Sequence, residues 1–462
     1  MANIAPLLRR FKKDPLKILN PQRIERVCRA VGYAWRDREL SPAMTLGLFV
    51  RQILEGNCAC SAVAHLAGAT FTASAYCQAR SRLPLVVYQR MAREVCEVAL
   101  SMRPGVKRKG LGRHRTLLID GTAFIMPDQG GLAQVYGTAS GRAAGSSYPM
   151  AHLLLLFDAA TGLLLEHVAS PFNTSDLAAS AGVQGHLKAG DIVLGDQAYG
   201  TYAHIAILQQ KGVHGIFPVQ HGRIVDFTPN RPHRIERQRH HRDPDPEQAT
   251  ALAQMPTSRF VRCLGYQDQL VNWFKPRQCP NWISQQAYDA LPDSLLVREL
   301  RRDLCRAGRA RGSLTMVSTL LDPQEYPAAQ IRDLRLSRWD VETDIRHLKT
   351  QMGMSMLHCR TPQGLLKELT VFCLTYNLVR VVMLQAAKRQ EVAVDRISFS
   401  DALHWMEHAR PGDLFPKLMV NPLRPGRFEP RLIKRGFRRF PTMHQNRNLS
   451  RRMQKQRTFA LT

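Results

Sequence analysis

The chain contains 462 residues, and its 65 Lys and Arg residues against 37 Asp and Glu residues give a formal net charge of +28, which favours a polyanionic partner such as nucleic acid. An anionic membrane is the competing partner, but no uninterrupted apolar run reaches about 18 residues and the first residues contain no signal-peptide core, so we expect a cytoplasmic protein and no membrane partner. The 10 cysteines are scattered without a CxxC pair, which argues against a zinc site and against a disulfide framework.

The first segment, residues 1–105, is dominated by helical periodicity. Ser74 is a candidate N-cap for a helix whose early face presents Arg80 and Arg82 to a nucleic acid. The alternative is that these residues simply punctuate a helical bundle. A basic run at 107–110 follows and is typical of a linker that touches backbone phosphates.

Two short apolar runs in the next segment each end at an aspartate. The run at 116–119 leads into Asp120, and the run at 192–194 leads into Asp196. Both patterns are typical of a buried strand that carries a carboxylate at its end. Each aspartate also has a purely structural interpretation, because Asp120 can serve as a turn residue and Asp196 as a helix cap.

The stretch between these aspartates predicts two more apolar strands, at about 152–157 and 163–168. Asp158 falls in the turn that joins them. Glu166 and Asp176 are harder to dismiss as structural residues, because Glu166 lies within a strand and Asp176 lies near a predicted helix start.

Residues 221–312 exceed what a minimal sheet needs at this point, and we expect them to form an inserted subdomain. The insertion begins with a basic loop in which three histidines, at 233, 240 and 241, form a loose group. Their loose spacing and cationic surroundings favour a solvated loop over a metal site. Alternating strands follow at about 260–264 and 270–274, and the run LTMVSTLL should return the chain to the core sheet.

The stretch from Leu336 to Lys349 predicts a helix with one acid among basic residues. On a helical wheel of about 100° per residue, a stripe roughly 60° wide holds Glu342 together with Arg335, Arg338 and Lys349. Asp340 and Asp344 fall on the far side, and an apolar stripe beside the charged one would hold the helix on a core. The arrangement suits a metal-binding acid beside a bound phosphodiester. The alternative is an ordinary amphipathic helix with i, i+4 ion pairs.

Two segments complete the chain. The stretch at about 363–388 predicts a core helix that is apolar on most sides. Within the final segment, 391–462, the basic stretch at 424–457 contains a Pro-Arg-x-x-Lys-Arg pattern and is expected to become ordered mainly on contact with a polyanion.

The spacing Arg-x3-Glu-x6-Lys at 338, 342 and 349, with aspartates at 120 and 196 upstream, resembles the signature of the DDE transposases of bacterial insertion sequences. It is most similar to the insertion-sequence 4 family, whose signature is Tyr-x2-Arg-x3-Glu-x6-Lys. Arg335 occupies the position of the Tyr here. The resemblance covers roughly residues 40–445. It implies an α/β fold with a ribonuclease-H-like core, in which Asp120, Asp196 and Glu342 are the catalytic and metal-binding acids.

The resemblance also implies a division of the chain. The expected parts are a helical DNA-end-binding domain (1–105), the first part of the ribonuclease-H-like core (111–220), a β-rich insertion (221–312), the second part of the core with the catalytic helix (313–390) and a basic C-terminal segment (391–462). The candidate DNA contacts are Arg80, Arg82, Arg335, Arg338, Arg346, Lys349 and, as aromatics that stack on a displaced base, Trp273 and Trp282. A buried core position is the alternative for each tryptophan.

The activity implied is metal-dependent cleavage of DNA at insertion-sequence ends, followed by strand transfer into target DNA. Two ions of Mg²⁺ or Mn²⁺ are expected, because paired divalent ions activate the attacking oxygen and stabilise the leaving oxygen. The expected partners are double-stranded DNA, as terminal inverted repeats and target, and a second copy of the chain in a homodimeric complex on the nucleoid. A stand-alone endonuclease of the same fold and a non-catalytic DNA-binding regulator are the alternatives, and the presence of all three acids with Lys349 argues against the regulator.

Overall fold

The computed structural model describes residues 19–68, 70–101, 111–139, 148–220, 222–229, 234–235, 256–306, 309–408 and 415–422. The basic run at 107–110, the loop histidines and the basic C-terminal pattern lie outside these ranges, so the expectations placed on them stay predictions. The helical elements are α2 (Pro21–Ala30), α3 (Pro42–Leu54), α4 (Cys60–Leu66), α5 (Ala73–Arg82), α6 (Leu85–Ser101), α7 (Leu132–Tyr136), α8 (Asp176–Ser180), η2 (Ala181–His186), η3 (Gln197–Tyr199), α9 (Tyr202–Gln210), α11 (Gln285–Asp289), α12 (Ala328–Leu336), α13 (Trp339–Arg346), η4 (His347–Gln351), α14 (Pro362–Gln390), η5 (Val394–Arg396) and α15 (Phe399–His408).

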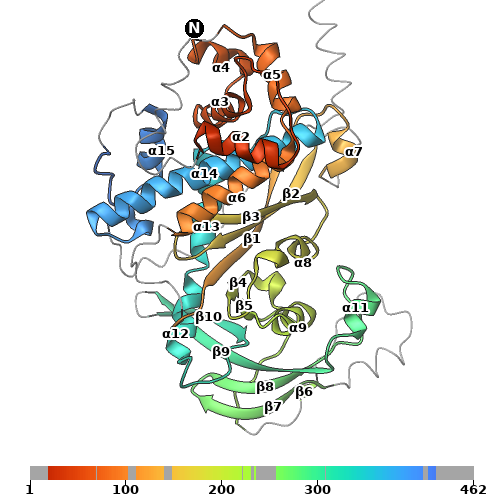
Figure 1. The fold of residues 1–462 in the computed structure, drawn as a ribbon. Helices are drawn as coiled ribbons and strands as arrows, with labels where there is room; N and C mark the ends of the chain where they lie inside the picture. The colour runs from red at the N-terminus through yellow and green to blue at the C-terminus, as the bar shows by residue number, and fades with distance from the viewer. Residues whose placement is uncertain are drawn as a thin grey trace, which may run out of the picture.

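The strands of the described residues join in one mixed sheet with the order β3-β2-β1-β4-β5-β10-β9-β8-β7-β6 (Figure 1). Their bounds are β1 (Thr116–Ile125), β2 (Met150–Asp158), β3 (Leu164–Pro171), β4 (Ile192–Leu194), β5 (His214–Pro218), β6 (Arg234–Ile235), β7 (Pro256–Gly265), β8 (Asp268–Phe274), β9 (Ser294–Arg306) and β10 (Arg309–Ser318). The central strands β1, β4 and β5 run parallel to one another, whereas the remaining pairs are antiparallel.

The central sheet is buried on both faces, and the alternation of side chains along β1 explains how. Leu117 and Ile119 pack into one hydrophobic cluster with α9, whereas Leu118 packs into the other with α14. Successive side chains of a strand point to opposite faces, so an apolar run without polar interruptions is what a doubly covered strand requires. Asp120 continues on the side of Leu118, and Gly121 continues on the side of Ile119.

The N-terminal helices share a hydrophobic core with the sheet. Side chains of α2, α3 and α6 join those of α14 in a single cluster, and Figure 1 shows these helices above β1–β3. Polar contacts reinforce the junction: the side-chain amide of Asn57 donates to Glu368 at 2.6 Å, and the Lys367 ammonium donates to the Ser81 carbonyl at 2.6 Å. The helical segment is thus packed on the core across an extensive interface.

The helix α14 is the element on which this packing depends. Its 29 residues are apolar enough to pass a length-and-composition test for a membrane span, but 94% of the apolar stretch is buried inside the protein. Lys367, Glu368 and Arg380 interrupt the apolar run, and all three are buried with protein partners. The helix predicted at 363–388 is therefore confirmed as a core helix.

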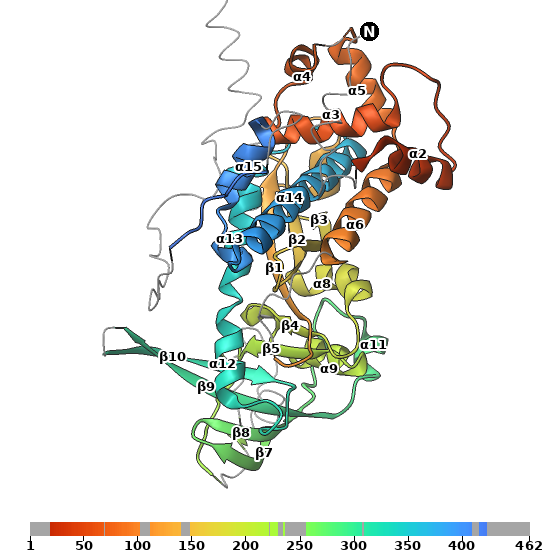
Figure 2. The ribbon, with the colours of Figure 1, turned by 60° about the vertical axis from the view of Figure 1, so that its left-hand side comes forward.

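The chain between β5 and α12 extends the sheet and does not fold apart from it. Strands β7, β8 and β9 add antiparallel pairs beyond β10, and β10 pairs with β5, as expected for the run LTMVSTLL. The hairpin of β9 and β10 projects to one side of the molecule (Figure 2). The insertion is β-rich, as predicted.

The stretch predicted as one helix at 336–349 is divided in the structure. Helix α12 ends at Leu336, α13 begins at Trp339, and a π-helical turn, η4, follows at His347–Gln351. The apolar stripe predicted from the wheel is buried, and Val341 and Leu348 are fully inaccessible. The division matters for the charged residues, because a π-turn changes the angular position of every side chain that follows it.

Candidate active site

Asp120 and Asp196 lie at matching positions on neighbouring parallel strands. Leu118 faces Leu194 across the β1–β4 pair, and the two aspartates each follow two residues later. β4 has ended by then, and Asp196 caps η3, where its Oδ1 accepts a hydrogen bond from the Ala198 backbone N–H at 2.8 Å. β1 continues past Asp120 to Ile125, further than the sequence predicted. The carboxyl ends of adjacent parallel strands form a shared crevice, which brings both carboxylates together.

A third aspartate, Asp176, joins them, and one ligand oxygen from each of the three carboxylates lies within 4.8 Å of the others. Asp176 is the first residue of α8, and its Oδ1 lies 2.5 Å from Nε2 of His152 on β2. The approach depends on Gly121, because a Cβ at that position would collide with the Asp176 carboxylate. Sequence reasoning left Asp176 unassigned, and the glycine that follows Asp120 is the signal that could have pointed to it.

Glu342 lies beside this cluster and is joined to it through Arg338. The Arg338 guanidinium donates to Glu342 Oε1 at 2.7 Å and to Asp120 Oδ2 at 3.2 Å. The i, i+4 pair that was the alternative interpretation of the helix is therefore present, and it coexists with a second contact to β1. Arg338 is 12% exposed, so both ion pairs are largely shielded from solvent.

Burial shapes the electrostatics of the site. Burial raises the pKa of Asp120 to about 6, the Arg338 guanidinium opposes this rise, and Asp196 adds to it. Burial also lowers the pKa of Arg335 to about 9, with Arg338 contributing in the same direction. The Arg335 Nε is buried without a hydrogen-bond partner among the described residues. Arg335 thus carries a positive charge that Asp120 and Asp196 stabilise only in part.

The hydroxyl of Tyr199 is a second buried polar group without a partner. Tyr199 is fully buried, and its hydroxyl oxygen has no hydrogen bond within the described residues. Burial raises the pKa of Tyr199 well above its ordinary value, and the charges of Asp176, Asp120 and Asp196 raise it further. Tyr199 itself lies in η3, the turn that Asp196 caps.

Lys349 contacts β1. Its ammonium donates to the Thr122 hydroxyl at 3.1 Å and to the Ala123 carbonyl at 2.6 Å, two to three residues beyond Asp120. The wheel placed Lys349 in the stripe of Glu342 on the assumption of an unbroken α-helix. Lys349 lies in the π-turn η4, from which it reaches the strand.

The structure separates the other predicted DNA contacts into two groups. Arg82 and Arg346 are exposed. Arg80 does not fit its predicted role as a DNA contact. Its guanidinium stacks on the Phe49 ring at 3.6 Å and donates to Gln52 at 2.8 Å, inside the helical core. The cap of its helix is also shifted: Thr72, not Ser74, accepts the capping hydrogen bond.

The two tryptophans also differ. Trp273 is 1% exposed and donates its indole N–H to Glu299 at 2.9 Å, so it is a core residue and is not available to stack on a base. Trp282 is partly buried against the cluster that contains α9, and its stacking role stays a prediction.

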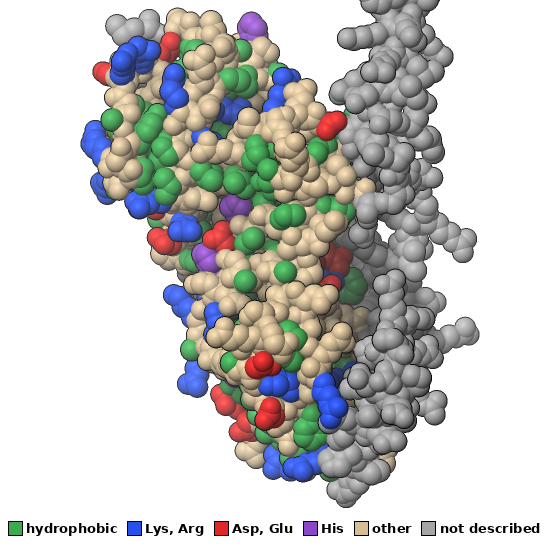
Figure 3. All heavy atoms as spheres, turned by 90° about the vertical axis from the view of Figure 1, so that its right-hand side faces the viewer, with side chains coloured by type: hydrophobic (Ala, Val, Ile, Leu, Met, Phe, Trp, Pro, Cys, Tyr) green, Lys and Arg blue, Asp and Glu red, His purple; other side chains and the backbone are tan. Residues whose placement is uncertain are grey.

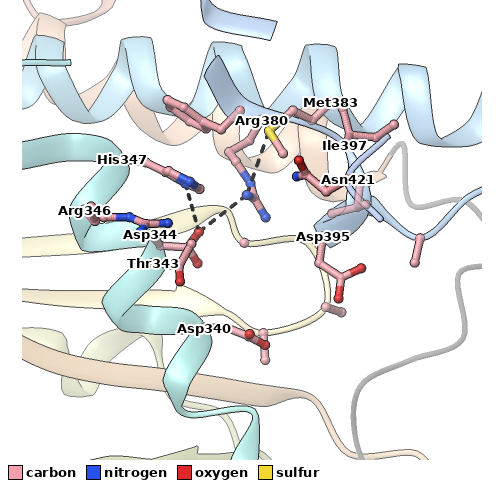
Figure 4. A pocket seen from close by; sticks show the side chains of 16 residues that line it. Asp340, Thr343, Asp344, Arg346, His347, Arg380, Met383, Asp395, Ile397 and Asn421 are labelled. Carbon is pink, nitrogen blue, oxygen red and sulfur yellow. Dashed lines mark hydrogen bonds and ion pairs between the residues drawn. The ribbon is translucent and has the colours of Figure 1, made fainter. Parts of the chain in front are cut away.

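A pocket of about 310 Å³ lies on the opposite side of α13 from Asp120, Asp176 and Asp196. Figure 4 shows Asp340, Asp344 and His347 on its wall with Arg380 from α14. Asp344 is buried and pairs with Arg380 at 3.4 Å. The predicted division of α13 into a Glu342 side and an Asp340–Asp344 side therefore matches the structure.

The aspartate cluster has the donor set of a divalent-cation site. Mg²⁺ and Mn²⁺ prefer carboxylate oxygens, and three of them converge here next to the turn that holds the buried Tyr199. Carboxylates about 4 Å apart repel one another by around 4 kcal/mol at an effective dielectric constant near 20, and a bound cation removes this repulsion. The residues present thus fit a divalent metal ion.

The comparisons with known proteins agree with this chemistry. The family model described as "Transposase DDE domain" matches residues 111–378, which is more than half of the chain. The transposase InsG for insertion sequence element IS4 of Escherichia coli (strain K12) is 28% identical over 202 residues, which cover 39% of this chain and 43% of that protein, so the match spans less than half of the relative. The cryo-EM structure of a piggyBac transposase synaptic complex with hairpin DNA is similar over 88% of this chain and 80% of the other, with 10% identity and a TM-score of 0.38, a value too low to support further argument. On the evidence of the family model, the chain belongs to the DDE-domain transposases.

Proposed function

We propose that this protein is a transposase that cuts DNA at the ends of an insertion sequence and transfers the strand into target DNA, using a divalent metal ion. The observation that carries the proposal is the convergence of Asp120 and Asp196 from adjacent parallel strands with Arg338, which precedes α13, and Glu342 of that helix. The match to the transposase DDE domain over 111–378 supports it.

The catalytic core is proposed to be ribonuclease-H-like. The support is the order β3-β2-β1-β4-β5, with an antiparallel β1–β2–β3 meander and β4 and β5 parallel to β1. In such a core the first acid lies on β1, the second follows β4, and the third lies on a later helix. Asp120, Asp196 and Glu342 occupy those places.

Asp120, Asp196 and Glu342 are proposed to hold the metal, as Mg²⁺ or Mn²⁺ and as two ions when DNA is bound. When bound, paired divalent ions supply activation of the attacking oxygen and stabilisation of the leaving oxygen. Arg338 and Arg335 are proposed to bind the phosphate on either side of the scissile bond, because a guanidinium stays protonated and forms paired hydrogen bonds to phosphate oxygens. Lys349 is proposed to hold β1 in register beside Asp120 through Thr122 and Ala123.

The rest of the molecule is proposed to position the DNA. Residues 1–105 bind the ends of the element, with exposed Arg82 among the contacts, and Arg346 contacts the backbone near α13. Lys and Arg side chains are spread over the face in Figure 3, with acidic side chains between them. This dispersed charge suits a long DNA path better than one small anionic ligand. A homodimer on double-stranded DNA of the nucleoid is the proposed working assembly.

The experiment that tests the function is cleavage of a supercoiled plasmid that carries the two ends of the element. The sequences of these ends are first identified by sequencing the DNA that flanks the gene. Wild type is expected to nick and linearise this plasmid only with Mg²⁺ or Mn²⁺. Asp120→Asn, Asp196→Asn and Glu342→Gln should each reduce cleavage at least a hundredfold while end binding is retained, because metal ligands are lost and the basic surface stays.

The same experiment separates the alternatives. Cleavage without joining to target DNA would indicate a stand-alone endonuclease. End binding without any metal-dependent cleavage would indicate a regulator. Retention of near wild-type cleavage by any of the three variants would remove that residue from the catalytic set.

A further inference from the structure

We infer that Asp176 is a metal ligand, and that the protein holds its first divalent ion on Asp120, Asp176 and Asp196 before DNA arrives, whereas Glu342 joins the site only after Arg338 moves. This inference rests on the proposed function for its role in cleavage. The metal site itself is argued from the geometry of the described residues.

The first observation is the distribution of the acids. Asp120, Asp176 and Asp196 have ligand oxygens within 4.8 Å of one another, and Glu342 is not part of that group. Arg338 lies between Glu342 and Asp120, with hydrogen bonds of 2.7 Å and 3.2 Å to the two carboxylates. Arg338 therefore occupies one oxygen of each carboxylate, Oε1 of Glu342 and Oδ2 of Asp120, and stands between Glu342 and the cluster.

The second observation is the buried hydroxyl of Tyr199. Tyr199 is fully inaccessible and belongs to η3, the turn that Asp196 caps, and its hydroxyl meets no partner in full hydrogen-bond geometry among the described residues, although the Asp176 carboxylate lies near it. A buried polar group without a partner is unfavourable unless a further ligand satisfies it. A hydrated cation on the three carboxylates would provide one, because a metal-bound water can hydrogen bond with the hydroxyl.

The third observation concerns the support of Asp176. His152 holds its Oδ1 at 2.5 Å, and the other ring nitrogen of His152 lies 3.2 Å from the Ser170 hydroxyl. Gly121 leaves the space into which the carboxylate projects. An outer residue that fixes the direction of a ligating carboxylate is a usual part of a metal site, and its loss typically weakens metal affinity about 10- to 100-fold.

The roles of Arg338 and Glu342 follow from this arrangement. A DNA phosphate offers Arg338 a competing acceptor with the same geometry as a carboxylate. When Arg338 turns to the phosphate, Glu342 is released beside Asp120. Full assembly of the acids is then linked to the presence of DNA.

The test is Mn²⁺ binding to the full-length protein without DNA, measured by titration calorimetry and by electron paramagnetic resonance of the bound ion. Wild type should bind one Mn²⁺. Asp176→Asn should weaken binding at least tenfold, and Glu342→Gln should change it less than threefold. Asp340→Asn, on the opposite side of α13, is the matched acidic control and should bind as wild type.

Tyr199→Phe keeps the ring and removes the hydroxyl, so it tests the site even if Asp176→Asn folds poorly. It should weaken Mn²⁺ binding about three- to tenfold and alter the resonance spectrum of the bound ion. Wild-type affinity in both Asp176→Asn and Tyr199→Phe would overturn the inference, as would equal losses in Glu342→Gln and Asp176→Asn.

The failure of this inference is distinct from failure of the proposed function. If wild type cleaves DNA with Mg²⁺ but binds no Mn²⁺ without DNA, the function stands and the inference is wrong. If Mn²⁺ binds through the three aspartates but no DNA end is cut, the metal site stands and the proposed function is wrong.

Discussion

Arg335 is the residue whose surroundings are least favourable to its own charge. Burial and Arg338 lower its pKa to about 9, below its unfolded value, so its positive charge opposes folding at every pH below about 9. Arg335→Met should therefore raise the free energy of unfolding by about 2 kcal/mol, measured by urea denaturation at pH 7. The same variant should cleave DNA at least tenfold more slowly if the charge is retained for a phosphate.

The exposed Arg346, on the next helix, is the matched control for this prediction. Arg346→Met should change the free energy of unfolding by less than about 0.5 kcal/mol, because the side chain lies in solvent. A loss of stability in Arg335→Met would mean that the attraction of its charge to Asp196 and Asp120 outweighs the desolvation of that charge.

His204 predicts how the protein responds to acid. Burial lowers its pKa to about 4, and its Nδ1–H donates to the Tyr199 carbonyl at 2.9 Å. Because the folded pKa lies below the unfolded value near 6.5, stability is complete above about pH 6.5 and falls as the pH drops toward 4. The loss attributable to this group is about 3 kcal/mol.

Urea denaturation at pH 7 and pH 4.5 measures this effect. His204→Gln should reduce the difference in unfolding free energy between the two pH values by about 2 to 3 kcal/mol. The exposed His65→Gln on α4 should leave that difference as in wild type. An unchanged difference in His204→Gln would assign the acid sensitivity to other groups.

At the scale of elements, α13 separates the charges that serve chemistry from those that serve packing. Asp344 pairs with the fully buried Arg380, whose other nitrogens donate to the Thr161 carbonyl. Asp344→Ala would leave Arg380 buried without its carboxylate and should lower the free energy of unfolding by about 3 to 5 kcal/mol. Asp340→Ala, one turn earlier on the same side, should lower it by about 1 kcal/mol or less. Thermal and urea denaturation of both variants give the comparison, and equal losses would contradict the pairing.

The same helix shows which parts of the site sequence patterns can predict. The wheel placed Glu342 with Arg338 and put Asp344 on the other side, because α13 itself is a regular helix. The wheel did not predict the contact of Lys349 with β1, because nothing in the local spacing indicates a π-turn. A helical wheel predicts which side chains share a face only where the helix is regular.

Asp176 was beyond the reach of this kind of reasoning for a different reason. Its position depends on a loop after β3, on a helix of five residues and on the absence of a side chain at Gly121. These features depend on the tertiary structure and not on the local sequence. The two acids that end strands were predictable, because a strand fixes both the direction and the neighbours of the residue that follows it.

At the scale of the whole molecule, the described parts of the chain share packing that the sequence pattern did not identify. The described helices of the domain expected at 1–105 contribute to the same hydrophobic cluster as α14, and the described strands of the insertion continue the central sheet. Periodicity identifies the face of a helix that is buried, but it does not identify the element that covers that face. For this reason Arg80 was assigned to DNA, although it fills a place in the core between α3 and α5.

The net charge of +28 makes the dependence of DNA binding on salt a property of the whole chain. Each phosphate contact releases condensed counterions and contributes about −0.9 to the slope of log affinity against log salt. If the charged surface of one protomer contacts about ten phosphates, fluorescence anisotropy with a duplex of the element's end should give a slope near −9.

Arg82→Ala should reduce the steepness of this slope by about one, because Arg82 is exposed, whereas Arg80→Met should leave the slope unchanged, because its charge lies in the protein core. A slope near zero in wild type would mean that the positive charge serves a partner other than DNA, and equal slopes for Arg82→Ala and wild type would move the DNA path away from α5.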